Sequence, residues 1–215
     1  IGIGMPGYLI NGVLHGCPNI PCLKGKQVLN LLQKRFDVPV TIENDANCFA
    51  LAEQHWGAGA GKNDVVGVII GTGVGSGIIV GGKLITGSRG AAGEFGGIPY
   101  GDDDIESYTA GPGILARYRK RGGKLTDVKA IFKSKENAAQ QTINEAMQAL
   151  GWMLVVISRA VDPEMIVLGG GVSNEPIITP VRDILKAAGR TTKVIKHKLG
   201  TSSGVLGAAS LVFRK

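Results

Sequence analysis

A carboxylate at a strand-to-helix junction is the residue of this sequence best placed for proton-transfer chemistry. Residues 38–42 form a short apolar run typical of a buried strand, and residues 43–56 after it are rich in helix formers. Asp45, at the junction, could accept a proton from a substrate hydroxyl as a general base, with Asn44 binding a neighbouring hydroxyl. Asn or Asp at a helix start is also a good N-cap, which is the commoner role. The junction alone leaves both roles open.

Two glycine-rich segments are candidates for binding a nucleotide. Residues 71–77 read G-T-G-V-G-S-G between two apolar runs, and successive glycines let backbone N–H groups point together into an anion cradle. Thr72 and Ser76 could add hydroxyl donors, although the lysine of a P-loop is absent. A glycine hairpin that permits close packing is the alternative. Residues 169–171, G-G-G after an apolar run, could accommodate the flat face of a base or form a simple turn.

Three further patterns give weaker signals. Glu94 lies within A-G-E-F-G-G, where one carboxylate among glycines could pair with sugar hydroxyls or occupy a surface turn. Residues 2–7 match G-x-G-x-x-G, but loop residues follow instead of a helix, so the match does not indicate a dinucleotide site. The three histidines are widely spaced and none lies near a cysteine pair, which argues against a metal site.

The elements that would position these residues alternate between strands and helices. The chain has 215 residues, 34 of them glycine, and 44% apolar residues, which is typical of a folded protein with many tight turns. Apolar residues at steps of four and three from Ile143 to Val161 indicate one face of a buried helix. The expected strands are residues 1–4, 38–42, 65–70, 78–80, 83–86, 165–168 and 193–199, and the expected helices are 24–36, 43–56, 107–121, 137–161, 180–188 and 204–213. This alternation predicts the α/β class.

Charge and cysteine content bound the setting of the protein. The net charge is +7, but the two short basic clusters, at 117–124 and 193–198, lack interleaved aromatic residues, which favours solvated surfaces over a nucleic-acid site. Three cysteines without a C-x-x-C pair favour a reduced cytoplasm. The uncharged stretch 65–82 contains seven glycines, so it predicts two strands around a turn and not a membrane span. The first residues already read as the middle of a strand, so we expect an upstream segment.

Several motifs in a fixed order resemble one known family. They are G-M-P-G, C-P-N-I-P, E-N-D-A-N, G-T-G-V-G-S-G, A-G-E-F-G, I-E-S-Y-T-A-G, D-P-E-M-I-V-L-G-G-G-V and a closing G-A-A-S-L. This succession is similar to the ROK family, which contains sugar kinases and kinase-derived transcriptional repressors on the actin-like, ribonuclease-H-type fold. The resemblance implies that fold, the ATP-dependent phosphorylation of a hexose hydroxyl as in glucokinases, and Mg²⁺ bound with the ATP.

The resemblance also implies roles for single residues. Asp45 matches the family's catalytic base, and the sugar contacts fall on Gly7, Asn44, Glu94 and Glu106. The ATP phosphates and the adenosine fall on two short segments, which are Gly71, Thr72 and Gly73, and Gly169, Gly170 and Gly171. Phosphoryl transfer depends on positioning and charge neutralisation, so a base, a phosphate cradle and magnesium would suffice.

The chain departs from the family pattern in two places. Gly97 stands where the family usually has a histidine, and the C-x-C-G-x-x-G-C zinc segment after it is absent, so we expect no structural zinc and a rebuilt wall near the sugar. The D-x-G-x-T hairpin that contacts the ATP phosphates is also absent, and the family would place it before Ile1. Without that hairpin, catalysis would fall severely, because an incomplete phosphate clamp stabilises the transition state less.

The resemblance gives a lobe division and leaves alternatives open. Residues 1–45 are expected to be the remainder of a small N-terminal lobe and residues 46–215 the large lobe, with the final helix a candidate to return to the small lobe. The alternative functions are a sugar-responsive repressor with an upstream DNA-binding segment, a kinase for N-acetylmannosamine or N-acetylglucosamine, and an inactive kinase-like module. The expected partners are a sugar, ATP and a second copy of the chain in a cytoplasmic homodimer, with no membrane and with nucleic acid only in the repressor case.

Overall fold

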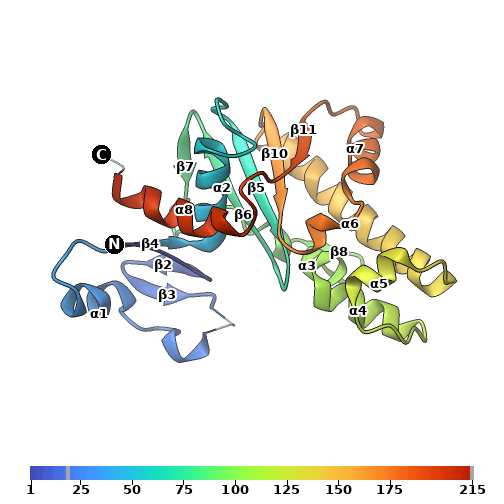
Figure 1. Ribbon diagram of the computed structural model, residues 1–215, viewed down its shortest axis with the longest axis horizontal. Coiled ribbons are helices and arrows are strands. Elements are labelled where there is room, and N and C mark those ends of the chain that lie inside the picture. Colours follow the sequence, from blue (N-terminus) through green and yellow to red (C-terminus); the bar gives the residue numbers. More distant parts are fainter. Residues whose placement is uncertain (18–19, 214–215) are drawn as a thin grey trace.

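In the computed structural model, which describes residues 1–17 and 20–213, a five-stranded sheet forms the centre of the molecule (Figure 1). The strand order is β11–β10–β5–β6–β7. The neighbours β5 (Val65–Ile70), β10 (Met165–Gly169) and β11 (Lys193–Lys196) pair in parallel. β6 (Val74–Val80) pairs antiparallel with β5 and with β7 (Lys83–Ile85), so it alone among the five strands runs in the opposite direction. The C-P-N-I-P motif is only partly visible, because its Pro18 and Asn19 lie outside the described residues.

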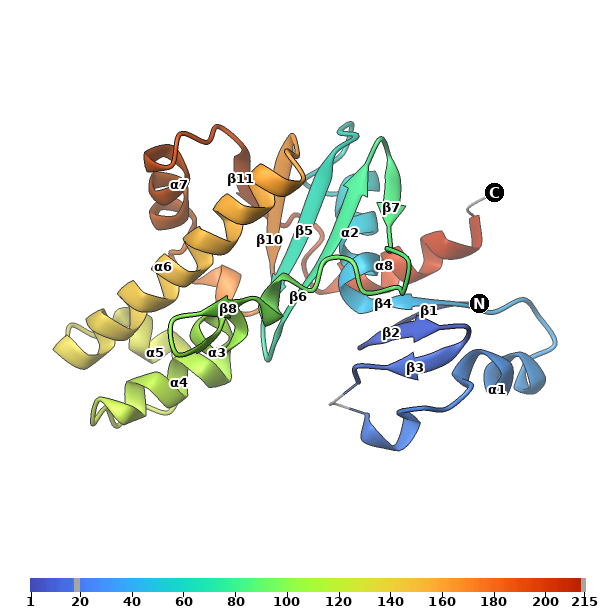
Figure 2. The same ribbon diagram turned by 180° about the vertical axis from the view of Figure 1, so that it is seen from behind.

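Helices cover both faces of this sheet, as the two opposite views show (Figures 1 and 2). α2 (Asp45–His55) lies on one face, and α6 (Asn137–Ala160) with α7 (Ile178–Ala187) on the other. Successive residues of β5 point to opposite faces, so Val66 and Val68 enter the main core with α6 while Val65 packs with Phe49 of α2. The near-continuous apolar sequence of β5 and β10 follows from this burial on both sides.

The N-terminal residues form a smaller unit beside the sheet. β1 (Gly2–Met5) runs parallel to β4 (Thr41–Asn44), β2 (Tyr8–Ile10) and β3 (Val13–His15) form a hairpin, and α1 (Val28–Arg35) packs beside them. Met5, Leu14, Cys17 and Val28 form a separate small core there. β4 leads directly into α2, which packs on the sheet. The small unit is therefore connected to the sheet at the strand-to-helix junction of Asn44 and Asp45.

Short elements form an arm at the other end of the molecule. They are β8 (Pro99–Tyr100), β9 (Asp103–Asp104), α3 (Ile105–Thr109), α4 (Gly111–Lys120) and α5 (Val128–Lys133). The arm packs on α6, whose predicted apolar stripe lies in the main core: Met147, Leu150, Leu154 and Ile157 are buried. Across the described ranges, none of the helices is both long enough and apolar enough to span a membrane.

Some expected boundaries are wrong, and the glycine run is the instructive case. β6 already begins at Val74, so the predicted loop 71–77 shortens to residues 71–73. A Cβ on Gly75 would lie 2.9 Å from the Ala46 Cβ, and one on Gly77 would lie 2.8 Å from the Ala46 carbonyl oxygen. The second half of the run therefore lets α2 pass close to the strand, which is the close-packing alternative. The expected helix 107–121 is also two helices, because α3 ends at Thr109 and α4 starts at Gly111.

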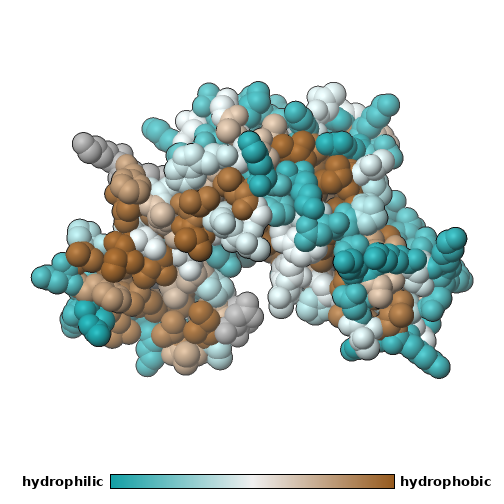
Figure 3. All heavy atoms as spheres, viewed as in Figure 1, coloured by the Kyte–Doolittle hydropathy of each residue, from teal (hydrophilic) through white to brown (hydrophobic). Residues whose placement is uncertain are grey.

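The last helix, α8 (Ser203–Ser210), lies between α2 and β1. A Cβ on Gly207 would collide with the Cys48 carbonyl oxygen, and one on Gly2 would collide with the Ala208 carbonyl oxygen, so both contacts require glycine. Apolar side chains gather on this side of the surface (Figure 3), including Val205, which is 75% exposed. The C-terminal helix thus adjoins the N-terminal strand.

A buried carboxylate anchors the C-terminal end of α2. Glu53 is fully buried and accepts hydrogen bonds from the backbone N–H groups of Ala58, Lys198 and Leu199, at 2.9 to 3.0 Å, and from the Ser203 hydroxyl at 2.8 Å. Burial alone would raise the pKa of Glu53, but these donors outweigh it and hold the pKa below the ordinary 4.5. The ionised side chain therefore ties α2 to the connection between β11 and α8.

Glu53→Gln should lower the free energy of unfolding by about 2–4 kcal/mol at pH 7, because the amide brings two N–H donors into a pocket of donors. The pKa of Glu53 is lowered on folding, so its stabilisation is full above pH 4.5 and is lost as pH falls through the folded pKa. Urea unfolding at several pH values checks both statements. Ser203→Ala is the control, with an expected loss of about 1 kcal/mol. A variant as stable as the parent at pH 7 would contradict this role.

Candidate active site

The first turn of α2 settles which residue of the junction is the cap. The Asn44 side-chain oxygen accepts hydrogen bonds from the backbone N–H groups of Ala46, at 2.9 Å, and Asn47, at 3.1 Å. The side-chain amide of Asn44 donates to the Gly7 carbonyl oxygen at 2.9 Å, which joins the chain after β1 to the helix start. Because Asn44 serves as N-cap, Asp45 is free of that role, and its exposed carboxylate stands at the helix start with Oδ1 3.0 Å from the Ala46 nitrogen.

A cavity of about 380 Å³ opens beside this helix start. Its walls come from the chain around the β2–β3 hairpin, the start of α2, the loop before β6, and the segments that hold Glu94 and Glu106. The space-filling view shows the molecule hollowed between the N-terminal strands and the arm (Figure 3). The sequence-predicted residues that line the cavity are Gly7, Asn44, Asp45, Gly71, Thr72, Gly73, Glu94 and Glu106. All predicted sugar contacts and the predicted phosphate loop thus meet in one place.

Three carboxylates line this cavity, and they repel one another. Glu106 accepts a hydrogen bond from the Val74 backbone N–H at 2.7 Å, at the start of β6. Desolvation of the Glu94 carboxyl, and after it the charges of Glu106 and Asp45, raise the pKa of Glu94 above the ordinary 4.5. The cavity therefore carries negative charge that a ligand rich in hydroxyl donors, or a cation, would offset.

A second cavity, of about 700 Å³, adjoins the first at Gly71 and Thr72, which line both. The starts of α4 and α5 and the turn after β10 form the rest of its wall, which includes Lys129 and Lys133. The Gly111 backbone N–H donates to the Gly71 carbonyl oxygen at 2.8 Å and so fixes the loop to α4. A short glycine loop therefore separates a cavity with three carboxylates from a larger one with two lysines and two carboxylates, Asp127 and Glu175.

The three glycines after β10 have different surroundings. A Cβ on Gly169 would collide with the Phe49 ring, and one on Gly170, whose φ is +85°, would collide with the Ile70 carbonyl. Close packing therefore explains these two glycines. Gly171 lines the larger cavity, and a Cβ there would meet nothing within 4 Å. Of the three residues predicted to lie near the adenosine, Gly171 is thus the one placed to meet a ligand.

Sequence reasoning missed the hairpin that brings Tyr8 and Gly16 to the first cavity. Its turn consists of Asn11 and Gly12, with φ values of +51° and +79°. Asn-Gly between two short apolar runs is a strong signal for such a hairpin, so the sequence did contain the information. α5, which carries the two lysines of the second cavity, is likewise outside the expected elements.

The residues present are compatible with magnesium that arrives with a nucleotide. Among the residues described, no group of three or more His, Cys, Asp or Glu side chains could hold a metal ion. Mg²⁺ in phosphoryl-transfer sites needs no such group, because one or two carboxylates hold it together with phosphates and water. Desolvation, and after it the charges of Glu106 and Asp45, raises the pKa of Glu94, and a divalent cation would offset the part that comes from these charges. Gly97, where the family usually has histidine, faces open space.

Comparison with known proteins identifies the family. The model of the ROK family matches residues 1–215. This chain belongs to the ROK family. The N-acetylgalactosamine kinase AgaK of Shewanella sp. (strain ANA-3) is 32% identical to it over an alignment of 243 positions, gaps included. The alignment covers 98% of this chain and 77% of that protein.

Two solved ROK structures are similar to this chain over nearly all its length. The ROK hexokinase of Thermus thermophilus gives a TM-score of 0.85 at 31% identity, covering 97% of this chain and 76% of that one. A ROK glucokinase of Streptomyces griseus, solved with glucose and AMPPNP, gives 0.83 at 28% identity, covering 98% and 80%. These likenesses confirm the α/β class and the actin-like fold predicted from the motifs. The roles of the individual cavity residues and the lobe boundary after residue 45 stay predictions.

The raised pKa of Glu94 means that its ionisation opposes folding. Its contribution is favourable only at low pH and is lost as pH rises from the unfolded pKa through the folded one. Glu94→Gln should therefore raise the free energy of unfolding at pH 7, by less than about 1 kcal/mol because the side chain is open to solvent. The gain should vanish below about pH 4.

Thermal unfolding of the protein and the Glu94→Gln variant between pH 3.5 and pH 8 measures this effect. Asp37→Asn, an exposed carboxylate outside the cavity, is the matched control and should show no such pH dependence. A Glu94→Gln variant that is less stable than the parent at pH 7 would show that the three charges do not repel as described.

Proposed function

We propose that this ROK chain carries the acceptor and donor sites of an ATP-dependent sugar kinase whose acceptor is a hexose. The convergence of Asp45 with Glu94, Glu106 and the Gly71–Thr72–Gly73 loop around one cavity is the observation that supports this function best. A sugar presents hydroxyl donors to carboxylates, and a glycine loop presents backbone N–H groups to phosphates. The family membership supports the same conclusion.

Asp45 acts as the general base in this proposal. Its carboxylate accepts the proton of the acceptor hydroxyl, the hydroxyl oxygen forms a bond to the γ-phosphorus of ATP, and the bond from that phosphorus to the β-γ bridging oxygen breaks to release ADP. Asp45 stands in the first turn of α2, and its carboxylate lines the first cavity. Asn44, Glu94 and Glu106 hold the other hydroxyls and orient the sugar.

ATP occupies the larger cavity, with its phosphates at Gly71 and Thr72, the residues that line both cavities. Lys129 and Lys133 supply positive charge along that wall. Mg²⁺ would be held chiefly by the ATP phosphates and water and would supply charge neutralisation on the transferring phosphoryl group. In this proposal the Gly71–Thr72 loop lies where the two substrates meet.

N-acetylhexosamines are a second acceptor class, favoured by the likeness to a kinase named for N-acetylgalactosamine. A homodimer and a cytoplasmic location also belong to the proposal, supported by the family resemblance and by the cysteine content respectively.

Asp45→Asn should lower sugar-dependent ADP release by about 10²–10⁴-fold, because the amide cannot accept the proton, while the affinity for the sugar stays within a few-fold. The measurement is ADP release from the protein in its complete reading frame, with ATP and Mg²⁺, across hexoses and N-acetylhexosamines, together with calorimetric sugar binding. Asp183→Asn, at an exposed site on α7, is the matched control and should leave the rate unchanged.

Each outcome of this assay has a distinct meaning. Near-normal turnover by Asp45→Asn would remove Asp45 from the role of base. No ADP with any sugar would overturn the kinase and favour the sugar-responsive repressor, which a DNA-binding measurement on the complete reading frame would then test.

A further inference from the structure

Glu106 lines the first cavity, which we call the acceptor cavity because the sugar is proposed to bind there. It lies on a helix that cannot be stable by itself. α3 has five residues, and helices shorter than about twelve residues are marginal in water without tertiary contacts. Asp104 caps it by accepting a hydrogen bond from the Ser107 backbone N–H at 2.8 Å, and Ile105 is buried in the main core. These contacts fix the first turn but leave open what holds the rest of the helix and the hairpin before it.

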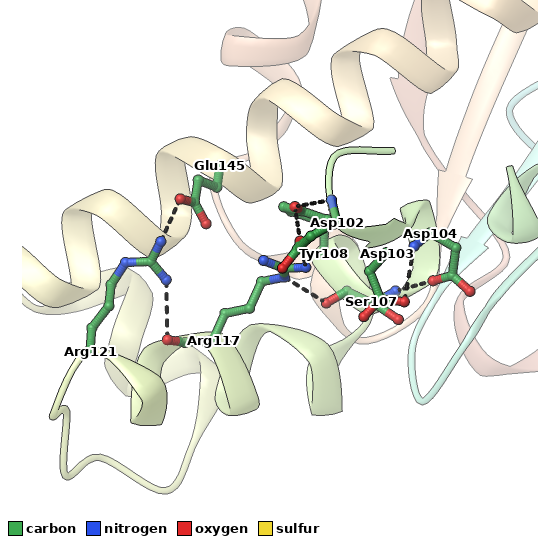
Figure 4. A network of polar contacts seen from close by, with 8 residues as sticks. All are labelled: Asp102, Asp103, Asp104, Ser107, Tyr108, Arg117, Arg121 and Glu145. Carbon is green, nitrogen blue, oxygen red and sulfur yellow. Dashed lines mark hydrogen bonds and ion pairs between the residues drawn. The ribbon is translucent and has the colours of Figure 1, made fainter. Parts of the chain in front are cut away.

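Arg117 of α4 supplies that support through three contacts (Figure 4). Its Nε donates to the Ser107 carbonyl oxygen at 3.2 Å, and its Nη2 donates to the Asp102 carboxylate at 2.8 Å. The guanidinium carbon lies 3.2 Å from the centroid of the Tyr108 ring, which is a cation–π contact. The Arg117 side chain is only 11% exposed, whereas its partner Asp102 is 70% exposed, so the contacts with the Tyr108 ring and the Ser107 carbonyl are the shielded part of this support.

The groups that Arg117 contacts also contact each other. The Tyr108 hydroxyl donates to the Asp102 carboxylate and accepts from the Asp102 backbone N–H at 3.3 Å. The hydrogen bond from Tyr108, and then the hydrogen bond and charge of Arg117, lower the pKa of Asp102 to about 2, so the carboxylate stays ionised in ordinary buffers. Gly101 is required beside it, because a Cβ there would collide with the Tyr108 hydroxyl.

A cavity behind Glu106 explains why this support matters. This space, of about 320 Å³, is lined by Glu106 and Thr72 on one side and by Arg117 and Lys120 on the other. Glu106 thus lies between the acceptor cavity and an open space that contains two cationic side chains. The Val74 backbone N–H donates to the Glu106 carboxylate at 2.7 Å, and this bond needs α3 in place. If α3 loosened, the bond would be lost and the carboxylate could turn into the open space behind it.

We propose that Arg117 is a positioning residue for the acceptor sugar: it fixes the β8–β9 turn and α3 to α4 and thereby holds the Glu106 carboxylate in the wall of the acceptor cavity. This role rests on the proposed function, since it is expressed as sugar affinity. Arg117 acts through Glu106 and does not contact the reacting atoms. Lysine would keep the charge but not the planar group that bonds two acceptors and stacks on the ring at once.

The test is a steady-state comparison of Arg117→Met and Arg117→Lys with the parent protein in its complete reading frame, using the sugar that gives the highest ADP release. Arg117→Met should raise the KM for the sugar by about tenfold, with the KM for ATP within twofold and kcat within threefold. Arg117→Lys should fall between the parent and Arg117→Met. Arg121→Met is the matched control, because the Arg121 side chain pairs with Glu145 of α6 and donates to the Arg117 backbone carbonyl oxygen at 3.1 Å, and these partners lie on α6 and α4 and not on α3 (Figure 4).

A double-mutant comparison separates positioning from a general loss of structure. In a Glu106→Gln background, Arg117→Met should raise the sugar KM by no more than twofold, because the group that it positions is already altered. A tenfold effect in that background, an equal rise in both KM values, or an Arg121→Met variant with the same sugar defect would overturn the proposal. If Arg117→Met fails to fold, Asp102→Asn replaces it, with a sugar KM at least threefold higher expected and an unchanged KM as the contrary result. No turnover by the parent with any sugar would instead overturn the proposed function, and this role with it.

Discussion

The position of α2 is the constraint on which the rest of the structure depends, because its backbone lies against its neighbours without intervening side chains. Gly67 and Gly77 of the sheet face the backbone of the helix on one side, and Gly207 of α8 faces it on another. Any larger residue at these positions would push α2 outward. Glu53 fixes the far end of the same helix to the chain before α8. These contacts fix the position of the helix, and they thereby fix the position of Asp45 at its start.

Two carboxylates of the molecule show how burial and hydrogen-bond partners decide whether an ionised side chain stabilises or destabilises the fold. Glu53 is surrounded by donors, so its pKa is lowered and its charge supports the fold. Glu94 is partly desolvated and also faces other carboxylates, so its pKa is raised and its charge opposes the fold. Folding tolerates the second arrangement because the cavity is open to solvent, which screens the repulsion. The hydroxyl donors of a ligand would offset this repulsion between the carboxylates. An arrangement that lowers the stability of the free protein would then favour binding of the ligand.

The sequence predicted which residues come together around the first cavity better than it predicted the elements that carry them. The junction at Asn44 and Asp45 left cap and base as alternatives, and only the hydrogen bonds of Asn44 show that the cap is Asn44, which leaves the role of Asp45 as base a prediction. The glycines at 71–77 look alike in sequence, yet residues 71–73 form the loop and Gly75 and Gly77 accommodate α2, because the difference depends on which helix passes over the strand. The β2–β3 hairpin was missed although Asn11-Gly12 indicated it, since its strands have only three residues each.

The arm shows a limit of motif reasoning that has a physical cause. The motif I-E-S-Y-T-A-G contains Glu106 and Tyr108, but the residues that hold this helix in place, Asp102 and Arg117, lie outside the motif on a turn and on another helix. A motif contains the groups that meet a ligand, whereas the groups that hold them depend on how neighbouring elements pack. In this chain a planar cation stacked on an aromatic ring and bonded to two oxygens performs the second task, so the composition of the acceptor wall and its rigidity come from different residues. Related chains could therefore keep the motif unchanged and still differ in sugar affinity if the support behind it differed.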